Sequence, residues 1–329
     1  MHELDLDDPI FDGLKADYPD FQGWYRRSAR SQRDALLVEG EEEHAALAVL
    51  KQETEGAYGL AGPLLKVCTF KVSGRYSGQK YGELLLKAIF NQAHAENDAG
   101  IYMTVFEKHE KLIELVEDFG FRPLQIRSSL GELVYAKPHR PMPVGSMDPL
   151  EYHITFGPPA LPLSAGHVFI VPIEPRWHRV LFPDAEPNDA LIPAIEGLTI
   201  RPFGNAIRKA YLCHSPSRIL KPGDVLLFYR SGDEKAVYVV GVCEGVLVSA
   251  SPDEIAATVG RRTVYSYDDI TDLTLKGPVL VIQFRQDRVL SEPLDLEELR
   301  SAGAIRSWPQ SVTKIQTEGE PWLAQRLDV

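Results

Sequence analysis

Residues 62–106 read GPLLKVCTFKVSGRYSGQKYGELLLKAIFNQAHAENDAGIYMTVF, and their pattern decides the fold of the first half of the chain. Residues 62–73 are apolar and β-branched, which favours a strand. After a short turn, residues 81–96 carry apolar side chains at the spacing of one helical face, and residues 101–106 form a continuous apolar run typical of a buried strand. The apolar positions of the predicted helical face are Leu84, Leu85, Ala88, Ile89 and Ala93.

The segments on either side extend this pattern. Residues 34–40 and 44–53 resemble neighbouring strands around an acidic turn, although AALAVL within the second could equally be helical. Residues 110–121, EKLIELVEDFGF, predict a helix that ends at Gly120. The order is therefore strand, helix, strand, helix, which predicts a mixed sheet with flanking helices.

The second half is rich in short strands separated by Gly, Pro and Asp, which predicts a small β-barrel or sandwich and an α+β class for the whole chain. The predicted strands are HVFIVPI from residue 167, DVLLFYR from 224, AVYVVGVCEGVLV from 236, RTVYS from 262 and PVLVIQF from 278. Two helices are predicted from their caps, at residues 251–259 with Ser251 as N-cap and at residues 294–303 ending at Gly303.

Length and prolines indicate two domains. A chain of 329 residues exceeds the usual size of one domain. Residues 137–150 contain four prolines, which interrupt helices and central strands. We therefore predict a first domain at 1–140, a linker at 141–150 and a second domain at 151–329. Residues 182–197 are predicted to be a surface loop for the same reason.

Composition restricts the class of function. A net charge of −12 repels nucleic-acid backbones, so a general nucleic-acid coating protein is excluded and any such site must be local. No apolar run approaches the length of a membrane helix, and the acidic start differs from a basic targeting signal, so a cytoplasmic protein without membrane association is expected. The three cysteines, Cys68, Cys213 and Cys243, are too scattered for a disulfide framework or a structural metal site, and no metal is expected.

The turn between residues 73 and 81 has the features of a phosphate-binding loop. A strand that enters a helix through a glycine-containing turn leaves N–H groups free at the positive end of the helix dipole. This loop, the following strand and the helix closing in EDFGF resemble the GNAT acetyltransferases over roughly residues 1–140. The six-residue motif of that family aligns with Ser77, Gly78, Gln79, Lys80, Tyr81 and Gly82. Gly82 matches the pattern, whereas Ser77 replaces the usual Gln or Arg and Lys80 stands where glycine is common.

The resemblance implies that acetyl-CoA binds where two central strands separate. The cradle residues 77–82 would hold the pyrophosphate through main-chain N–H groups, which tolerate both departures from the motif. Main-chain groups of Phe70, Lys71 and Val72 would hold the pantetheine and the thioester. A donor aimed at the thioester oxygen would stabilise the charge that develops when an amine attacks.

The resemblance leaves the proton donor and acceptor open. The tyrosine that many family members place ahead of the closing Gly-Phe corresponds to Val116, and their common asparagine corresponds to His109. The candidate replacements are Glu53, Tyr102, Glu107 and His109. Each also has a structural interpretation: Tyr102 as a core aromatic, Glu53 and Glu107 as solvated charges, and His109 as a residue at a helix start.

The second half resembles the PUA-like group of small barrels, which includes ASCH and EVE domains. The phrases RILKPGDVLLFYRS, VYVVGVCEGV and RRTVYSYDDI carry this resemblance. It implies a cleft for RNA or a modified base, in which Tyr229 stacks on a base and arginines and lysines contact phosphates. The alternative is that Tyr229 packs in the core and the basic residues pair with acids. The predicted phosphate contacts are Arg208, Lys209, Arg230, Arg261 and Arg262.

Together the two resemblances lead to one prediction and two alternatives. The prediction is an acetyl-CoA-dependent N-acetyltransferase whose acceptor is associated with RNA, such as charged tRNA, with an antitoxin protein as partner if the chain is a toxin. The first alternative is an RNA-binding or modified-nucleotide-binding protein with a catalytically degenerate GNAT domain. The second is a protein or small-amine acetyltransferase.

Overall fold

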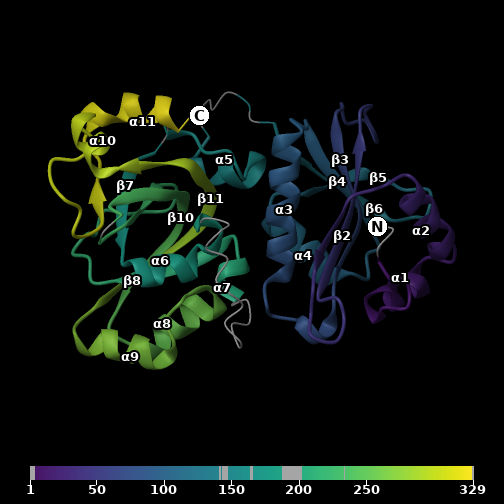
Figure 1. Cartoon of the computed structure of the whole chain (residues 1–329), viewed down its shortest axis with the longest axis horizontal. Helices are drawn as coiled ribbons and strands as arrows, with labels where there is room; N and C mark the ends of the chain where they lie inside the picture. Colours follow the sequence, from purple (N-terminus) through teal and green to yellow (C-terminus); the bar gives the residue numbers. More distant parts are fainter. Residues whose placement is uncertain are drawn as a thin grey trace. The chain divides into compact units, whose positions relative to one another are not determined.

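The computed structural model describes residues 4–140, 142, 147–163, 166–186, 202–232 and 234–327. The chain divides into two compact units, one of residues 1–142 with 154–156 and one of residues 143–153 with 157–329 (Figure 1). Each unit has its own six-stranded sheet. The helix α5, Pro149–Phe156, begins inside the stretch 141–150 that we predicted to be a linker, of which residues 141 and 143–146 lie outside the described part.

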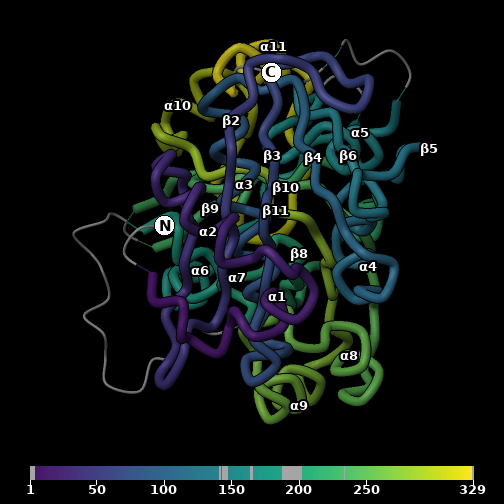
Figure 2. Tube along the Cα trace, turned by 90° about the vertical axis from the view of Figure 1, so that its right-hand side faces the viewer, coloured from purple at the N-terminus to yellow at the C-terminus, as the bar shows by residue number. Residues whose placement is uncertain are grey.

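The sheet of the first unit has the order β1-β2-β3-β4-β6-β5. Figure 2 shows β2, β3, β4, β6 and β5 following one another across the view. The predicted order of strand, helix, strand and helix is confirmed. The strands are β1 Ala35–Val38, β2 Ala46–Glu53, β3 Leu64–Val72, β4 Gly100–Val105, β5 Arg122–Arg127 and β6 Leu133–Pro138.

Helices cover both faces of this sheet (Figure 1). On one face, α1 Asp12–Asp17 and α2 Phe21–Arg30 enclose a core that joins Phe11 and Phe21 to Leu47 and Val49 of β2. On the other lie α3 Tyr81–Ala95 and α4 Glu110–Asp118. Gly120 ends α4 with a φ of +86°, as the sequence predicted. The short helices η1 Pro9–Phe11 and η2 Gly74–Tyr76 complete this unit.

The buried side of α3 differs in part from the prediction. Leu85, Ile89 and Ala93 are buried as expected, but Leu86 and Phe90 are buried in place of Leu84 and Ala88. The apolar residues of this helix surround more than half of its circumference, so their spacing alone does not fix which of them face the sheet.

Two neighbouring strands of this sheet separate along their length. β3 pairs parallel with β4 only from Leu64 to Val67, opposite Gly100 to Met103. On its other side β3 pairs antiparallel with β2 as far as Val72, with an extra residue, Cys68, between the pairs that flank it. Such a bulge bends the strand. The edge of β3 from residue 68 onward therefore turns away from β4 and leaves an opening.

The second unit contains a sheet of order β12-β7-β9-β10-β11-β8. Its strands are β7 Val168–Ile173, β8 Arg208–Cys213, β9 Val225–Arg230, β10 Ala236–Ser249, β11 Val279–Asp295 and β12 Thr313–Lys314. The helices around it are α6 Pro175–Leu181, η4 Pro183–Ala185, α7 Pro202–Asn205, α8 Pro252–Val259, η6 Gly260–Arg262, α9 Tyr267–Leu275, α10 Leu296–Ser301, η7 Thr317–Gly319 and α11 Glu320–Arg326.

The second sheet curls strongly around its own core. The Tyr211 hydroxyl of β8 donates to the carbonyl of Pro172 in β7 at 3.3 Å, although three strands lie between β7 and β8 in the sheet. In a flat sheet, strands four positions apart are separated by roughly 19 Å. Side chains from β7 to β11 share this core, so the sheet must wrap around it. The mixed fold class with a strand-rich second half is confirmed.

Some details of the second unit were predicted wrongly or missed. Residues 262–266 do not form a strand, because Arg262 ends η6 and Ser266 caps α9. The helix α6 was not predicted, although Pro175 in its first turn is a typical start signal. Ser251 caps α8 as expected, by accepting a hydrogen bond from the N–H of Glu254. In the predicted loop 182–197, η4 forms the start, and residues 187–197 lie outside the described residues.

Two buried histidines make the stability of the protein sensitive to acid. Burial, together with the charge of Lys137, lowers the pKa of His139 to about 3, and burial with the charge of Arg230 does the same to His178. In the unfolded chain these histidines bind a proton near pH 6.5, whereas in the folded protein they do so only near pH 3. The free energy of unfolding is therefore highest above pH 6.5, and it falls between pH 6.5 and pH 3 by about 1.4 kcal/mol per pH unit for each histidine.

We expect His139→Phe to reduce the slope of the free energy of unfolding against pH in the first unit. The phenyl ring can stack on Phe90 as His139 does, and it takes up no proton. Urea unfolding between pH 7 and 4 measures the slope. The control is His94→Phe, at an exposed position of α3, which should keep nearly the slope of the parent, because the charge of His94 lowers the pKa of His139 less than burial and Lys137 do. Parallel slopes for the parent and His139→Phe would contradict this expectation.

Candidate functional site

A cavity of about 690 Å³ opens in the first unit where β3 and β4 separate. Its wall is built from the edge of β3, the end of β4, the start of α3, part of α4 and the end of α1. The lining includes Gly13, Leu14, Asp17, Tyr18, Val67 to Gly74, Tyr76 to Gly78, Lys80 to Glu83, Met103 to Val105, Lys108 to Leu112 and Leu115.

The predicted strand segment Phe70, Lys71 and Val72 borders this cavity. The pairing of β3 with β4 ends at Val67, so the main-chain groups of residues 68–72 on that edge have no neighbouring strand in the described part of the unit. Main-chain polar groups need partners, and a bound molecule with amide groups could supply them. This edge fits an extended chain that continues the sheet.

The predicted phosphate loop lies at one end of the same cavity. Ser77, Gly78, Lys80, Tyr81 and Gly82 contribute to the wall, whereas Gln79 does not. The loop leads into the 15-residue helix α3, whose first N–H groups point along the helix axis toward the loop. An anion at this end of the cavity would therefore meet several donors.

Gly82 stands at a tight position between helices. A Cβ added there would lie 2.8 Å from Cδ2 of Leu115 in α4 and about 4 Å from side chains of Phe70 and Val72. The absence of a side chain lets the start of α3 approach Leu115 of α4 closely. The match of Gly82 to the motif thus has a steric reason.

The backbone conformation at Lys80 is one that favours glycine, the residue common at this position of the motif. It is the N-cap of α3 and has the left-handed backbone conformation φ 60°, ψ 20°, which costs a residue with a Cβ atom about 1 kcal/mol. Lys80→Gly should relieve this strain but also remove the 3.8 Å ion pair with Glu83. We therefore expect the free energy of unfolding to rise by a net amount of about 0.5 kcal/mol.

Urea denaturation measures the effect of Lys80→Gly. The matched control is Lys87→Gly inside α3, which should lower the free energy of unfolding by about 1 kcal/mol because glycine is a poor helix former there. Equal destabilisation by both changes would contradict the proposed strain.

One of the predicted catalytic residues, His109, reaches the cavity and has a carboxylate partner. Its Nε2 lies 2.9 Å from Oδ2 of Asp17, and Lys108 also donates to Asp17. Burial raises the pKa of the Asp17 carboxyl, but the hydrogen bonds and charges of Lys108, and then of His109, outweigh it and hold that pKa below its usual value. An ionised Asp17 only accepts, so neutral His109 carries its proton on Nε2 and has a free lone pair on Nδ1.

The other predicted catalytic residues lie outside the cavity wall. The Tyr102 hydroxyl donates to Oε2 of Glu53 at 2.6 Å, at the end of the sheet where β3 and β4 are still paired. Burial and this hydrogen bond raise the pKa of Tyr102 far above its ordinary value. Glu107 is exposed and pairs with Arg127. The structure therefore does not bring Glu53, Tyr102 and Glu107 into the cavity that His109 lines.

The structure also brings Asp17 and Tyr18 to the cavity, which sequence reasoning missed. The Tyr18 hydroxyl donates to Oε1 of the buried Glu132 at 2.6 Å. Burial and this carboxylate raise the pKa of Tyr18, so it holds its proton tightly. Val116, at the position of the expected tyrosine, is fully buried in α4. A tyrosine acid for the thiolate is thus not found at either place.

Comparison with known proteins identifies this unit. Residues 1–121 match the model of the acetyltransferase (GNAT) family. The first unit is a GNAT domain. A search of curated proteins finds no match to the chain. Among solved structures, the chain is similar to ASCH from Zymomonas mobilis, with a TM-score of 0.36, 13% identity and coverage of 48% of this chain and 94% of that one.

Two GNAT structures are also similar to the chain. A GNAT family acetyltransferase from Elizabethkingia anophelis with acetyl-CoA bound has a TM-score of 0.29 and 14% identity, and covers 36% of this chain and 82% of that one. An acetyltransferase of the GNAT family from Staphylococcus aureus has a TM-score of 0.30 and 17% identity, with coverage of 37% and 78%.

Outside the GNAT domain, three of the six residues expected to contact nucleic acid are buried, which corrects that expectation. Tyr229 is 0% exposed and belongs to a core cluster with Val168 and Leu299, so its ring cannot stack on a base. Lys209 is 1% exposed, and its ammonium donates to the carbonyls of Leu181, Phe203 and Gly204. The strand pattern did not show which side chains face inward.

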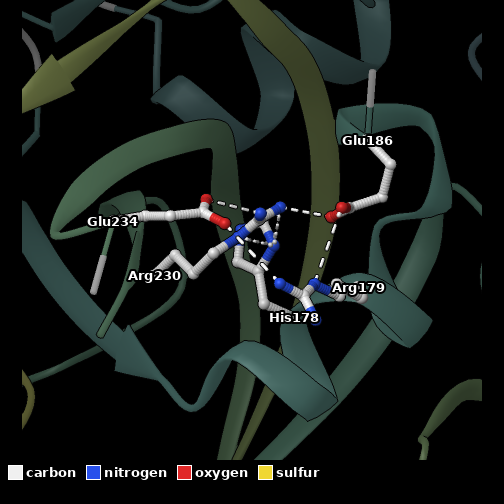
Figure 3. A network of polar contacts seen from close by, with 5 residues as sticks. All are labelled: His178, Arg179, Glu186, Arg230 and Glu234. Atoms are coloured by element: carbon white, nitrogen blue, oxygen red, sulfur yellow. Dashed lines mark hydrogen bonds and ion pairs between the residues drawn. The ribbon is translucent and has the colours of Figure 1, made fainter. Parts of the chain in front are cut away.

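Arg230 is the third buried residue and the centre of a polar network (Figure 3). Its guanidinium pairs with Glu186 and, at 2.6 Å, with Glu234. Its Nε donates to Nδ1 of His178 at 3.2 Å, and the group lies over the ring of Tyr238. The charge of Arg230 is therefore neutralised by carboxylates within the second unit.

The remaining three expected contacts keep some exposed surface. Arg208 pairs with Glu244 at 2.9 Å, and Arg262 donates to the main-chain carbonyl of Arg208. Arg261 is exposed on η6.

In the described ranges, none of the helices combines the length and apolar character needed to cross a membrane. In the same residues, no group of three or more His, Cys, Asp or Glu is placed to hold a metal ion.

Proposed function

We propose that the GNAT domain binds acetyl-CoA in the cavity between β3 and β4 and transfers the acetyl group to an amine, with His109 as the proton acceptor. One observation carries the proposal: the same cavity is bordered by the phosphate loop at the start of α3 and by the pair of Asp17 and His109. The residues proposed to bind the cofactor and the residue proposed to accept the proton therefore line one cavity.

The residues present fit the cofactor. Main-chain N–H groups of residues 77–82 would hold the pyrophosphate, and the free edge of β3 at residues 70–72 would pair with the pantetheine amides. Acetyl-CoA, when bound, supplies an activated thioester carbonyl. The protein contributes the placement of two reactants, which accounts for a large part of the rate in such transfers.

His109 is proposed to handle both protons of the reaction. The amine nitrogen forms a bond to the acetyl carbon while the carbon–sulfur bond breaks, and Nδ1 of His109 takes the proton that the nitrogen loses. Ionised Asp17 stabilises the imidazolium through Nε2. His109 then returns the proton to the leaving thiolate, because neither Val116 nor Tyr18 can do so. The products are an amide and a free thiol.

The identity of the acceptor distinguishes the rival functions. An RNA-associated acceptor, charged tRNA, an antitoxin partner and a toxin role stay predictions of the sequence. Their support is reduced because Lys209, Tyr229 and Arg230 are committed to the interior. The pair of Asp17 and His109 favours an active enzyme over a degenerate GNAT domain.

The test is acetyl transfer by the purified full chain. We expect thiol release from acetyl-CoA that depends on an added amine, with the acetylated amine detected by mass spectrometry. The panel should contain amino acids, amino phosphates, polyamines, peptides and aminoacylated tRNA. Binding of acetyl-CoA without transfer to any of these would favour the degenerate alternative.

A further inference from the structure

The side chains of β3 divide the cavity into two halves, one beside α3, where the cofactor is proposed to bind, and one beside α1. Phe70 and Val72 of β3 approach Gly82 at the start of α3, so these side chains lie on the α3 face. Lys71 alternates with them and is paired in register with Leu47, which packs in the core under α1 and α2. Lys71 therefore extends into the opposite half of the cavity, beside α1.

A glycine in α1 makes room for this lysine. Nζ of Lys71 lies 2.9 Å from the place that a Cβ atom on Gly13 would occupy. Both residues border the cavity, together with Asp17, Tyr18 and His109. The ammonium group thus stands in the same half of the space as the proposed proton acceptor.

This ammonium has no counter-ion in the described residues of the unit. The nearby carboxylates are committed elsewhere: Asp12 pairs with Lys15 at 3.2 Å, and Asp17 binds Lys108 and His109. A half-buried charge without a partner is costly, and a bound anion would relieve that cost. An acceptor with positive charge alone would be repelled.

We propose that the acceptor is an amine that also carries an anionic group, a carboxylate or a phosphate, and that Lys71 binds this group. The inference rests on the proposed function and specifies its substrate class. It makes Lys71 a specificity residue that positions the acceptor while His109 takes the proton. Amino acids and amino phosphates belong to this class, whereas polyamines do not.

Matched acceptor pairs test the proposal by activity. Alanine is compared with alaninamide, and phosphoethanolamine with ethanolamine, in the full chain. We expect kcat/KM to be at least about 10-fold higher for the anionic member of one pair, which also tells carboxylate from phosphate. In Lys71→Met this ratio should fall toward one, mainly through KM. The control Lys66→Met, on the same strand as Lys71 but outside the cavity wall, should keep the ratio of the parent.

A binding measurement separates this proposal from the proposed function. Calorimetry compares N-acetylalanine with N-acetylalaninamide, and N-acetylphosphoethanolamine with N-acetylethanolamine, because these products need no catalysis. Preference for an anionic product in the parent and its loss in Lys71→Met would support the anion site even if transfer is not observed. Equal affinity within both pairs, or a preference that survives in Lys71→Met, overturns the role of Lys71. Transfer to neutral amines with equal ease would then leave the proposed function standing.

Discussion

Replacing His109 by glutamine is expected to lower kcat for acetyl transfer by roughly 100-fold to 10,000-fold, the usual contribution of a positioned proton acceptor. Glutamine can still donate to Asp17 from its amide but has no basic nitrogen. The dissociation constant of acetyl-CoA should not change, because the main-chain groups of residues 70–72 and 77–82 that are proposed to hold the cofactor stay in place. Steady-state kinetics and calorimetry on the same preparation measure both quantities.

The control for His109→Gln is His94→Gln, which makes the same chemical change at an exposed position of α3. It should behave as the parent. A pH profile adds a second criterion: the parent should lose activity as pH falls through the pKa of the essential base, and this limb should vanish in His109→Gln. A variant that retains full kcat would move proton transfer to water or to the substrate itself.

Replacing Arg230 by methionine is expected to destabilise the second unit by about 3–5 kcal/mol. Arg230 is 2% exposed and is paired with Glu186 and Glu234. Removal of its charge leaves Glu186 and Glu234 with only the more exposed Arg179 as a shared cation, at the longer distances of 3.7 Å and 3.6 Å. The change also removes the hydrogen bond to His178. Urea denaturation followed by tryptophan fluorescence measures the loss.

The control for Arg230→Met is Arg176→Met. Arg176 pairs with Glu174 at 2.8 Å, but both side chains are largely exposed, so the free energy of unfolding should change by less than about 0.5 kcal/mol. If Arg230→Met were equally mild, the network of Figure 3 would not be a structural element, and Arg230 would again be a candidate contact for RNA. The stability of any such variant must therefore be known before its RNA binding is interpreted.

The core of the GNAT domain could be predicted from sequence because its signals are local. The strand at residues 64–72, the helix from Tyr81 and the stop at Gly120 each depend on side-chain periodicity or one special backbone angle within a short window. The phosphate loop was recognisable for the same reason. Even the departure at Lys80 has a local cause, its left-handed conformation.

The site could be predicted only in part, because its decisive contacts are distant in sequence. Asp17 and His109 are 92 residues apart, and no local pattern links them. Lys209 and Arg230 seemed to be surface residues because charged side chains are seldom fully buried without partners. Their partners come from other elements, such as Glu186 and the carbonyl of Leu181, which only the tertiary fold brings together.

The measurement that tests the account most directly is a calorimetric titration of the full chain with acetyl-CoA, beside the variant Gly82→Pro. Proline in the first turn of α3 removes one N–H of the cradle, and its ring enters the space next to Leu115. Asp268→Pro, at the same position of α9, is the matched control. We expect one equivalent of acetyl-CoA to bind to the parent and to the control but not to Gly82→Pro. Absence of binding to the parent, or equal binding to Gly82→Pro, would contradict the assignment of the cavity.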